Sequence, residues 1–167
     1  MISATSNAAA VIAKLQNYRV KVHGAGVEIR NRLCDVGAEE ARTAFAGAEY
    51  AGDLTVDVTT TQNGKVSSVV AKGQGVAFME FGAGISAGQG YPGERPDGIV
   101  GLGEYGDKKG ANPKGWIYRG LPGNSGIPVP NRPGRYRTKG NPPVAGMYAA
   151  ARKMEEDCAE VAEEVFR

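Results

Sequence analysis

The strongest chemical signal in the chain is a basic stretch between residues 107 and 140. It holds eight Lys and Arg residues against a single acid, Asp107, with Trp116, Tyr118 and Tyr136 interleaved. Cations contact phosphates and aromatic rings stack on bases, so this pattern could bind nucleic acid. A loop kept soluble by charge, or one that docks on an acidic protein surface, is the simpler interpretation. The candidate DNA-facing residues are Lys108, Lys109, Arg132, Arg135, Arg137 and Lys139.

Residue types that support catalysis or metal binding are sparse. His23 is the single histidine, which leaves neither a usual metal cluster nor a Ser-His-Asp triad, and we interpret it as a cap or surface residue. Residues 101–106 match a dinucleotide-binding pattern by letters, but residues 107–113 cannot start the helix that this motif requires. We therefore expect no catalytic residue, no cofactor and no metal. An enzyme such as a small hydrolase is the least favoured function for this chain.

The element expected to organise the fold is the apolar stretch from Gly75 to Gly84. As a strand it would place Phe78 and Glu80 on one face and Met79 and Phe81 on the other. Because both faces are mostly apolar, the pattern favours an interior strand covered on two sides. Glu80 is the exception. It is either a carboxylate that reaches solvent or a basic partner at the sheet edge, or an interface charge that is paired when subunits meet.

A hairpin precedes this stretch. Residues 54–59 alternate between apolar and polar side chains, and a β-rich run follows over residues 65–71. Asn63-Gly64 between them is a strong hairpin signal, since both residues tolerate the positive φ angles of a type I′ turn. With the strand at 75–84, the sequence predicts a three-stranded antiparallel meander.

Helices are expected at both ends of the chain. The first begins near Ser6 and a second runs to about Ala46, with a break at residues 23–26 where two glycines weaken the helix. The first helix has an apolar stripe, which comprises Val11, Ile12, Leu15, Tyr18 and Val22. A final helix starts at Asn141-Pro142-Pro143, apolar on one side from Met147 to Val165 and acidic on the other, most simply a solvated face.

Composition points to a single α+β domain over residues 1–167. The small antiparallel sheet would pack against the N-terminal helices and the C-terminal helix. Residues 82–140 hold sixteen of the 25 glycines and seven of the nine prolines, which predicts a long Gly/Pro-rich loop. Residues 114–119 form one ordered island within it, a short strand that could pair with the sheet.

Net charge, the lengths of the apolar runs and the cysteines indicate where the chain is made and what it could bind. The net charge of +2 is too balanced to imply nucleic-acid binding by itself. We expect no signal peptide and no membrane span. Cys34 and Cys158 fit small buried residues of a protein made in a reducing cytoplasm, and a disulfide formed late is the alternative.

The order of these segments resembles a known family. Gly52-Asp53-Leu54 opens a strand, a hairpin follows, then Val76-Ala-Phe-Met-Glu-Phe-Gly-Ala-Gly84, a Gly-rich loop, and Pro142-Pro-Val-Ala-Gly-Met-Tyr-Ala-Ala150 opening the last helix. This is similar to the tail-completion, or neck, proteins of long-tailed bacteriophages, over roughly residues 27–166. The most specific part is Glu-Phe-Gly-x-Gly. Threonine is common in that family where this chain has Ala83, and the middle loop is often much shorter.

The resemblance implies a structural virion protein at the head–tail junction, made in the host cytoplasm and acting as part of an oligomeric ring. Its partners would be further copies of itself and other phage neck or tail proteins, with contact to exiting DNA as an additional option. Ring closure needs a heterologous interface. The hypothetical interface residues are Phe78, Glu80, Phe81, Gly82, Gly84, Trp116, Tyr118 and Arg119. The alternative is a nucleic-acid-binding module that uses the basic loop over residues 108–139.

Overall fold

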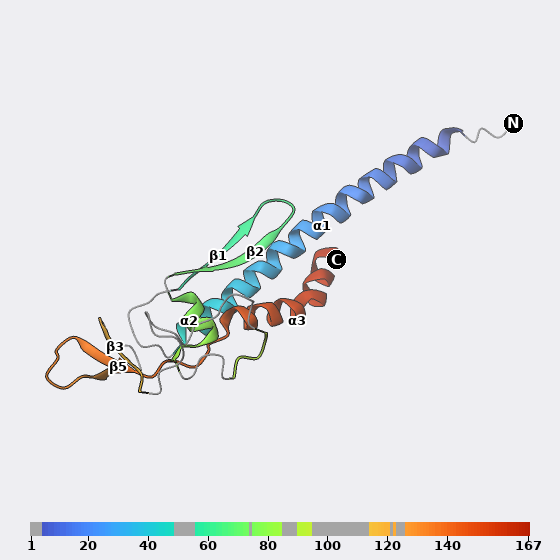
Figure 1. The fold of residues 1–167 in the computed structure, drawn as a ribbon. Helices are drawn as coiled ribbons and strands as arrows, with labels where there is room; N and C mark the ends of the chain where they lie inside the picture. The colour runs from blue at the N-terminus through green and yellow to red at the C-terminus, as the bar shows by residue number, and fades with distance from the viewer. Residues whose placement is uncertain are drawn as a thin grey trace.

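The computed structural model describes residues 5–48, 56–73, 75–84, 90–94, 114–120, 122 and 126–167, and these show an α+β fold. The elements in order are α1 (Thr5–Ala46), β1 (Asp57–Gln62), β2 (Ser67–Lys72), α2 (Val76–Phe81), β3 (Trp116–Arg119), β4 (Ile127–Pro128), β5 (Arg135–Thr138) and α3 (Gly146–Phe166). Figure 1 shows an elongated molecule in which α1 projects at one end and the β3–β5 sheet lies at the other.

Helix α1 is one continuous helix of 42 residues, so the predicted break at residues 23–26 is wrong. Gly24 and Gly26 are helical, and a Cβ added at either would meet nothing within 4 Å. Each glycine costs the helix only about 1 kcal/mol relative to alanine. Packing of the C-terminal half of α1 against α3 and the β1–β2 hairpin outweighs that cost.

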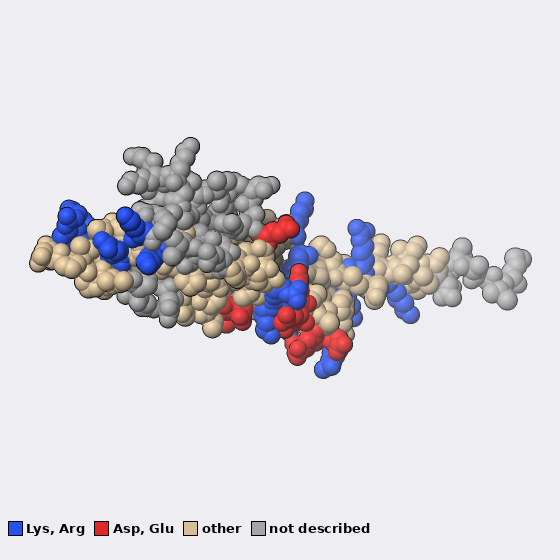
Figure 2. Space-filling model, turned by 60° about the horizontal axis from the view of Figure 1, so that its bottom comes forward, with Lys and Arg blue, Asp and Glu red and all other residues tan. Residues whose placement is uncertain are grey.

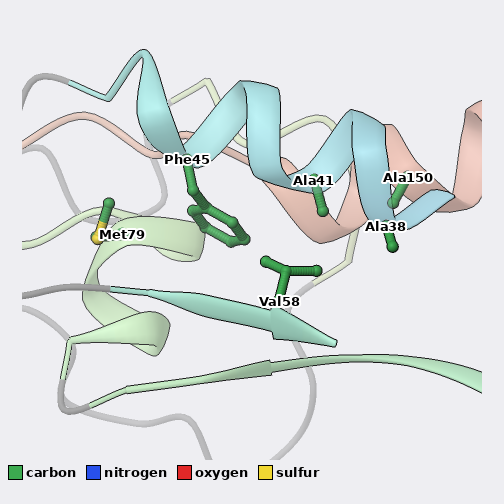
Figure 3. Packing of buried hydrophobic residues seen from close by; sticks show 6 residues of the cluster. All are labelled: Ala38, Ala41, Phe45, Val58, Met79 and Ala150. Carbon is green, nitrogen blue, oxygen red and sulfur yellow. The ribbon is translucent and has the colours of Figure 1, made fainter. Parts of the chain in front are cut away.

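The core lies where α1, α2, α3 and β1 meet. It comprises Ala38, Ala41, Phe45, Val58, Met79 and Ala150. Figure 3 shows the Phe45 ring pointing from α1 into the space between Val58 and Met79. The alanines allow α1 and α3 to approach closely, and Gly37 does so further, since a Cβ there would lie 2.8 Å from the sulfur of Met154.

The predicted hairpin is confirmed, with a different turn. Strands β1 and β2 pair antiparallel from Asp57↔Lys72 to Gln62↔Ser67. Gly64 has φ +82°, whereas Asn63 does not have a positive φ. The Asn63 side chain instead accepts hydrogen bonds from the Lys65 and Val66 amides at 3.2 and 2.8 Å. Asparagine therefore stabilises this turn through its side-chain oxygen and glycine supplies the positive φ.

The predicted interior strand is wrong, because residues 76–81 form the short helix α2. The β1–β2 sheet consequently has two strands rather than three. A short apolar run bounded by glycines does not distinguish a buried strand from a buried helix by its periodicity. Here the Met79 amide donates to the Gly75 carbonyl at 2.9 Å, which closes a helical turn.

A second sheet lies within the segment predicted as loop. Its strand order is β3-β5-β4, all antiparallel. The island at 114–119 is thus a strand, as predicted, but it pairs with residues 135–138 and not with the hairpin. Of the predicted loop, residues 85–89, 95–113, 121 and 123–125 lie outside the described residues.

Helix α3 starts at Gly146, later than the predicted start at Asn141. Ala145 precedes it with φ +55°. The buried positions of α3 include Ala150 and Val161, whereas Cys158 is exposed, contrary to the expectation that both cysteines are buried. The described helices include none that is both long and apolar enough to cross a membrane.

Candidate interaction surfaces

Glu80 connects α2 to α3, and we call the contact between these two helix ends the joint. Its side chain is 3% exposed, so it neither reaches solvent nor lies at a sheet edge, as one sequence interpretation proposed. One carboxylate oxygen accepts from the Met147 amide at 2.8 Å, and the other accepts from the Tyr148 amide at 3.1 Å. These amides belong to the first turn of α3, where helical N–H groups have no partner within the helix and a negative charge is favoured. Glu80 therefore caps α3 from another helix.

Backbone groups complete the joint. The Val144 amide donates to the Met79 carbonyl at 2.8 Å, and the Ala145 amide donates to the Glu80 carbonyl at 3.1 Å. These carbonyls lie at the C-terminal end of α2, where helix carbonyls lack intrahelical donors. Each helix end thus satisfies the other.

The two glycines of the Glu-Phe-Gly-x-Gly motif fit a close backbone approach. Gly82 has φ +79°, and a Cβ there would lie 2.9 Å from the Asn141 carbonyl oxygen. Gly84 has φ +65°, and a Cβ there would lie 2.7 Å from the ring of Trp116. Between them, the Ala83 amide and carbonyl pair with the carbonyl and amide of Asn141 at 2.9 and 3.2 Å. The motif is therefore a structural device that joins α2 to the chain leading into α3.

Three aromatic side chains lie beside the Glu80 carboxylate. The Tyr91 hydroxyl donates to Glu80 at 3.1 Å, and its ring lies 4.9 Å from Phe81 and 6.0 Å from Tyr148 between centroids. Burial, followed by the nearby Glu80 charge, raises the pKa of Tyr91 to about 12. These aromatic rings, with Glu94 at the rim, line an open pocket of about 550 Å³.

The β3–β5–β4 sheet presents a basic face. Register pairs Arg119 with Arg135 and Ile117 with Arg137, and residues paired directly opposite share a face of an antiparallel sheet. Ile127 also pairs with Arg137 and joins this face. Three guanidinium groups and two isoleucines therefore share one face, which we call the arginine face. Ile117 is 39% exposed and Ile127 63% exposed.

Within the part of the chain that the structure describes, no acidic residue neutralises the charge on the arginine face. Residues 114–140 include six basic residues and no acidic residue. None of Arg119, Arg135 and Arg137 forms an ion pair with another described residue. Figure 2 shows Lys and Arg side chains gathered at this end of the molecule.

The predicted interface residues fall into two groups. Glu80, Phe81, Gly82 and Gly84 are buried within the chain, and Phe78 is half-buried. Trp116 packs over Gly84, and the Tyr118 hydroxyl donates to the Pro122 carbonyl at 2.7 Å, which leaves Arg119 as the exposed member of the set. Contact of these residues with a neighbouring subunit stays a prediction.

The predicted DNA-facing residues are partly brought together. Arg135 and Arg137 share the arginine face, while Arg132 lies in the turn before β5 and Lys139 follows it, both exposed. Lys108 and Lys109 lie outside the described residues. Sequence reasoning missed Ile117 and Ile127, although alternation of Ile117 and Arg119 with Trp116 and Tyr118 was a readable signal.

Comparison with known protein families, curated proteins and solved structures finds no match for this chain.

Proposed function

We propose that this chain is a structural virion protein of a tailed bacteriophage, acting in a ring at the head–tail junction. The resemblance in the sequence supports this, and the fold gives its motif a physical role. Glu80, Gly82 and Gly84 hold α2, α3 and the second sheet together rather than forming a reactive site. A motif with such a role fits a protein that serves as a building block.

One observation carries the proposal further: the subunit exposes contact surfaces at opposite ends. The arginine face lies at one end, and the N-terminal part of α1 projects from the other with its side chains exposed (Figure 1). A ring requires two different patches that meet on successive subunits. The projecting end of α1 offers one such patch, and the arginine face leaves the opposite end of the subunit open to a different neighbour.

The first test is quantitative mass spectrometry of purified phage particles from the source that encodes the chain. A small, fixed copy number per particle supports the neck role, and absence from finished particles counts against it. A matched pair of variants sharpens the test: Ile127→Asp on the arginine face and Val66→Asp at the hairpin turn, 63% and 55% exposed. Both add one charge to an exposed apolar position, and we expect only Ile127→Asp to lose incorporation.

The arginine face favours a second candidate, a nucleic-acid-binding module. Guanidinium groups without acidic partners bind phosphates, and such binding weakens steeply with salt. Salt-sensitive binding of DNA by the purified chain, combined with absence from particles, would favour this alternative. Salt-sensitive binding by a chain present at fixed copy number would place DNA contact within the neck role.

A further inference from the structure

The N-terminal part of α1 is a helix without a partner within the described chain. We call residues 5–24 the arm; every described side chain from residue 8 to residue 24 is exposed. Val11, Leu15, Tyr18 and Val22 recur at steps of four and three, with exposed fractions of 51%, 62%, 66% and 40%. This spacing places them on one side of the helix. Most helical stability in proteins comes from packing of an apolar side, and the arm has no such packing within the described chain.

The apolar stripe of the arm continues into the interface between α1 and α3. At the root of the arm lies a groove of about 460 Å³, lined by α1 residues from Tyr18 to Glu28 and by Val165 and Phe166 of α3. Tyr18 and Val22 belong both to this groove and to the stripe. Phe166, at the end of α3, is 62% exposed. A partner helix on the stripe would therefore extend the packing that α3 makes on the rest of α1.

Charge identifies the partner. The arm carries Lys14, Arg19 and Lys21 and no acid, a net charge of +3 with His23 neutral. Two arms side by side would bring like charges together. Helix α3 has six acidic residues and two basic ones between residues 146 and 166, so its net charge is −4. Figure 2 shows acidic side chains on the body, with basic ones among them, whereas the projecting helix carries basic side chains.

The outer side of α3 also has exposed positions on which a helix could pack. Glu156, Ala159, Glu163 and Phe166 follow one another along that side at steps of three and four, and all four are exposed. Glu156 and Glu163 lie 3.7 Å from Arg152 and Arg167 of the same chain, in exposed ion pairs that a partner's cations could replace. Small side chains let two helices approach closely, and flanking carboxylates lie within reach of basic residues that border an apolar stripe. We propose that the arm of one copy docks on the outer side of α3 in a second copy. This contact is heterologous, and it rests on the proposed function because it supplies the head-to-tail joint that a ring needs.

Two variants of the full chain test the docking by sedimentation velocity. The arm variant is Leu15→Asp/Tyr18→Asp, and the face variant is Glu156→Lys/Glu163→Lys; all four positions are exposed, and circular dichroism checks that each variant folds. The wild-type chain should assemble. Each variant alone should have an association constant at least about a hundredfold lower than that of the wild type. An equimolar mixture should form dimers only, since it contains one intact arm and one intact α3 for each pair.

Val20→Asp is the matched control, because Val20 lies on the arm at 71% exposure, away from the stripe, and the change adds the same charge per site. It should assemble like the wild type. A monomeric wild-type chain, a face variant that still dimerises, or a mixture that stays monomeric would overturn the docking. Arm-dependent binding of a monomeric chain to vesicles of anionic phospholipid would overturn it too.

Particle analysis separates this inference from the proposed function. A chain that assembles through its arm in solution but is missing from particles would refute the neck role and leave the docking intact. A chain present in particles at a fixed copy number, whose arm variant is incorporated at the wild-type level, would refute the docking and leave the neck role intact.

Discussion

The Glu80 carboxylate accepts a hydrogen bond from the Met147 amide at 2.8 Å, across 67 residues of sequence. A buried carboxylate from one helix thus occupies the place that a side chain just before α3 would normally fill. No side chain at the N-cap residue, Ala145, does so. The relationship makes the start of α3 depend on the position of α2, and it explains why a charged residue lies within an apolar run.

Replacing Glu80 should therefore destabilise the fold. Glu80→Ala leaves the Met147 and Tyr148 amides and the Tyr91 hydroxyl without their acceptor, and we expect a loss of about 2–4 kcal/mol in the free energy of unfolding. Glu80→Gln should lose less, since one carbonyl oxygen remains. Urea unfolding followed by circular dichroism measures both. Glu94→Gln, at the exposed rim of the same pocket, is the control and should stay within about 0.5 kcal/mol of the wild type.

The raised pKa of Tyr91 predicts a specific alkaline instability. Because the folded-state pKa of about 12 exceeds the ordinary tyrosine pKa of 10, the neutral hydroxyl is favoured in the folded state. This contribution is complete below pH 10 and is lost as the pH rises through 12. The free energy of unfolding of the wild type should thus fall more between these pH values than that of Tyr91→Phe. Equal slopes for the two proteins would contradict the assignment.

Replacing a glycine of the Glu-Phe-Gly-x-Gly motif with alanine should destabilise the fold more than replacing the glycine of the hairpin turn. Gly82→Ala combines a positive φ with a Cβ 2.9 Å from the Asn141 carbonyl oxygen, whereas Gly64→Ala has a positive φ and open space. For Gly64→Ala we expect the free energy of unfolding to fall by roughly 1–2 kcal/mol, because of the backbone conformation alone. For Gly82→Ala we expect a loss of several kcal/mol or failure to fold. Thermal unfolding compares the two variants. Similar losses would show that the close approach at Gly82 relaxes without cost.

The fold class and several elements were predictable from the sequence. The β1–β2 hairpin followed from alternation around Asn63-Gly64, and the final helix from its apolar spacing, because both signals are local. The helix over residues 76–81 was not predictable in this way. Its conformation depends on the start of α3, whose amides bind the Glu80 side chain, and on the two residues before α3, which donate to two α2 carbonyls. A pattern within six residues does not indicate partners so distant in sequence.

The site was less predictable than the fold. Glu80 was identified as unusual, yet its acceptance of two backbone amides has no sequence signature. The basic stretch was identified from charge, but the alignment of Arg119 with Arg135 on one face required the register of β3 on β5. The continuity of α1 through Gly24 was missed since glycine propensity is a weak local effect that tertiary packing overrides.

The two cysteines should react differently with a thiol reagent. Cys158 is exposed, whereas Cys34 is 5% exposed and burial, with a smaller effect from Asp35, raises the pKa of its thiol. Under native conditions one thiol per chain should react rapidly with a chromogenic disulfide, and the second should react only in denaturant. Cys158→Ser should abolish the rapid phase. Two rapid phases in the wild type would show that the region around Cys34 opens readily.

The arginine face makes a quantitative prediction for nucleic-acid binding. If the purified chain binds duplex DNA through Arg119, Arg135 and Arg137, replacing all three with Gln should reduce the slope of log affinity against log salt by about 2–3, at roughly 0.9 per phosphate contact. Fluorescence anisotropy with a short duplex across several salt concentrations measures this slope.

The matched control for that experiment replaces Lys14, Arg19 and Lys21 of the arm with Gln, which removes the same charge from the opposite end of the molecule. A loss confined to the first triple variant would assign DNA contact to the arginine face, because net charge is equal in the two variants. An equal loss in both would indicate a general electrostatic effect. If the wild-type chain shows no salt-sensitive DNA binding, the arginine face would instead contact a neighbouring protein. Acidic side chains of that protein would then take the place of phosphates as partners of the arginines.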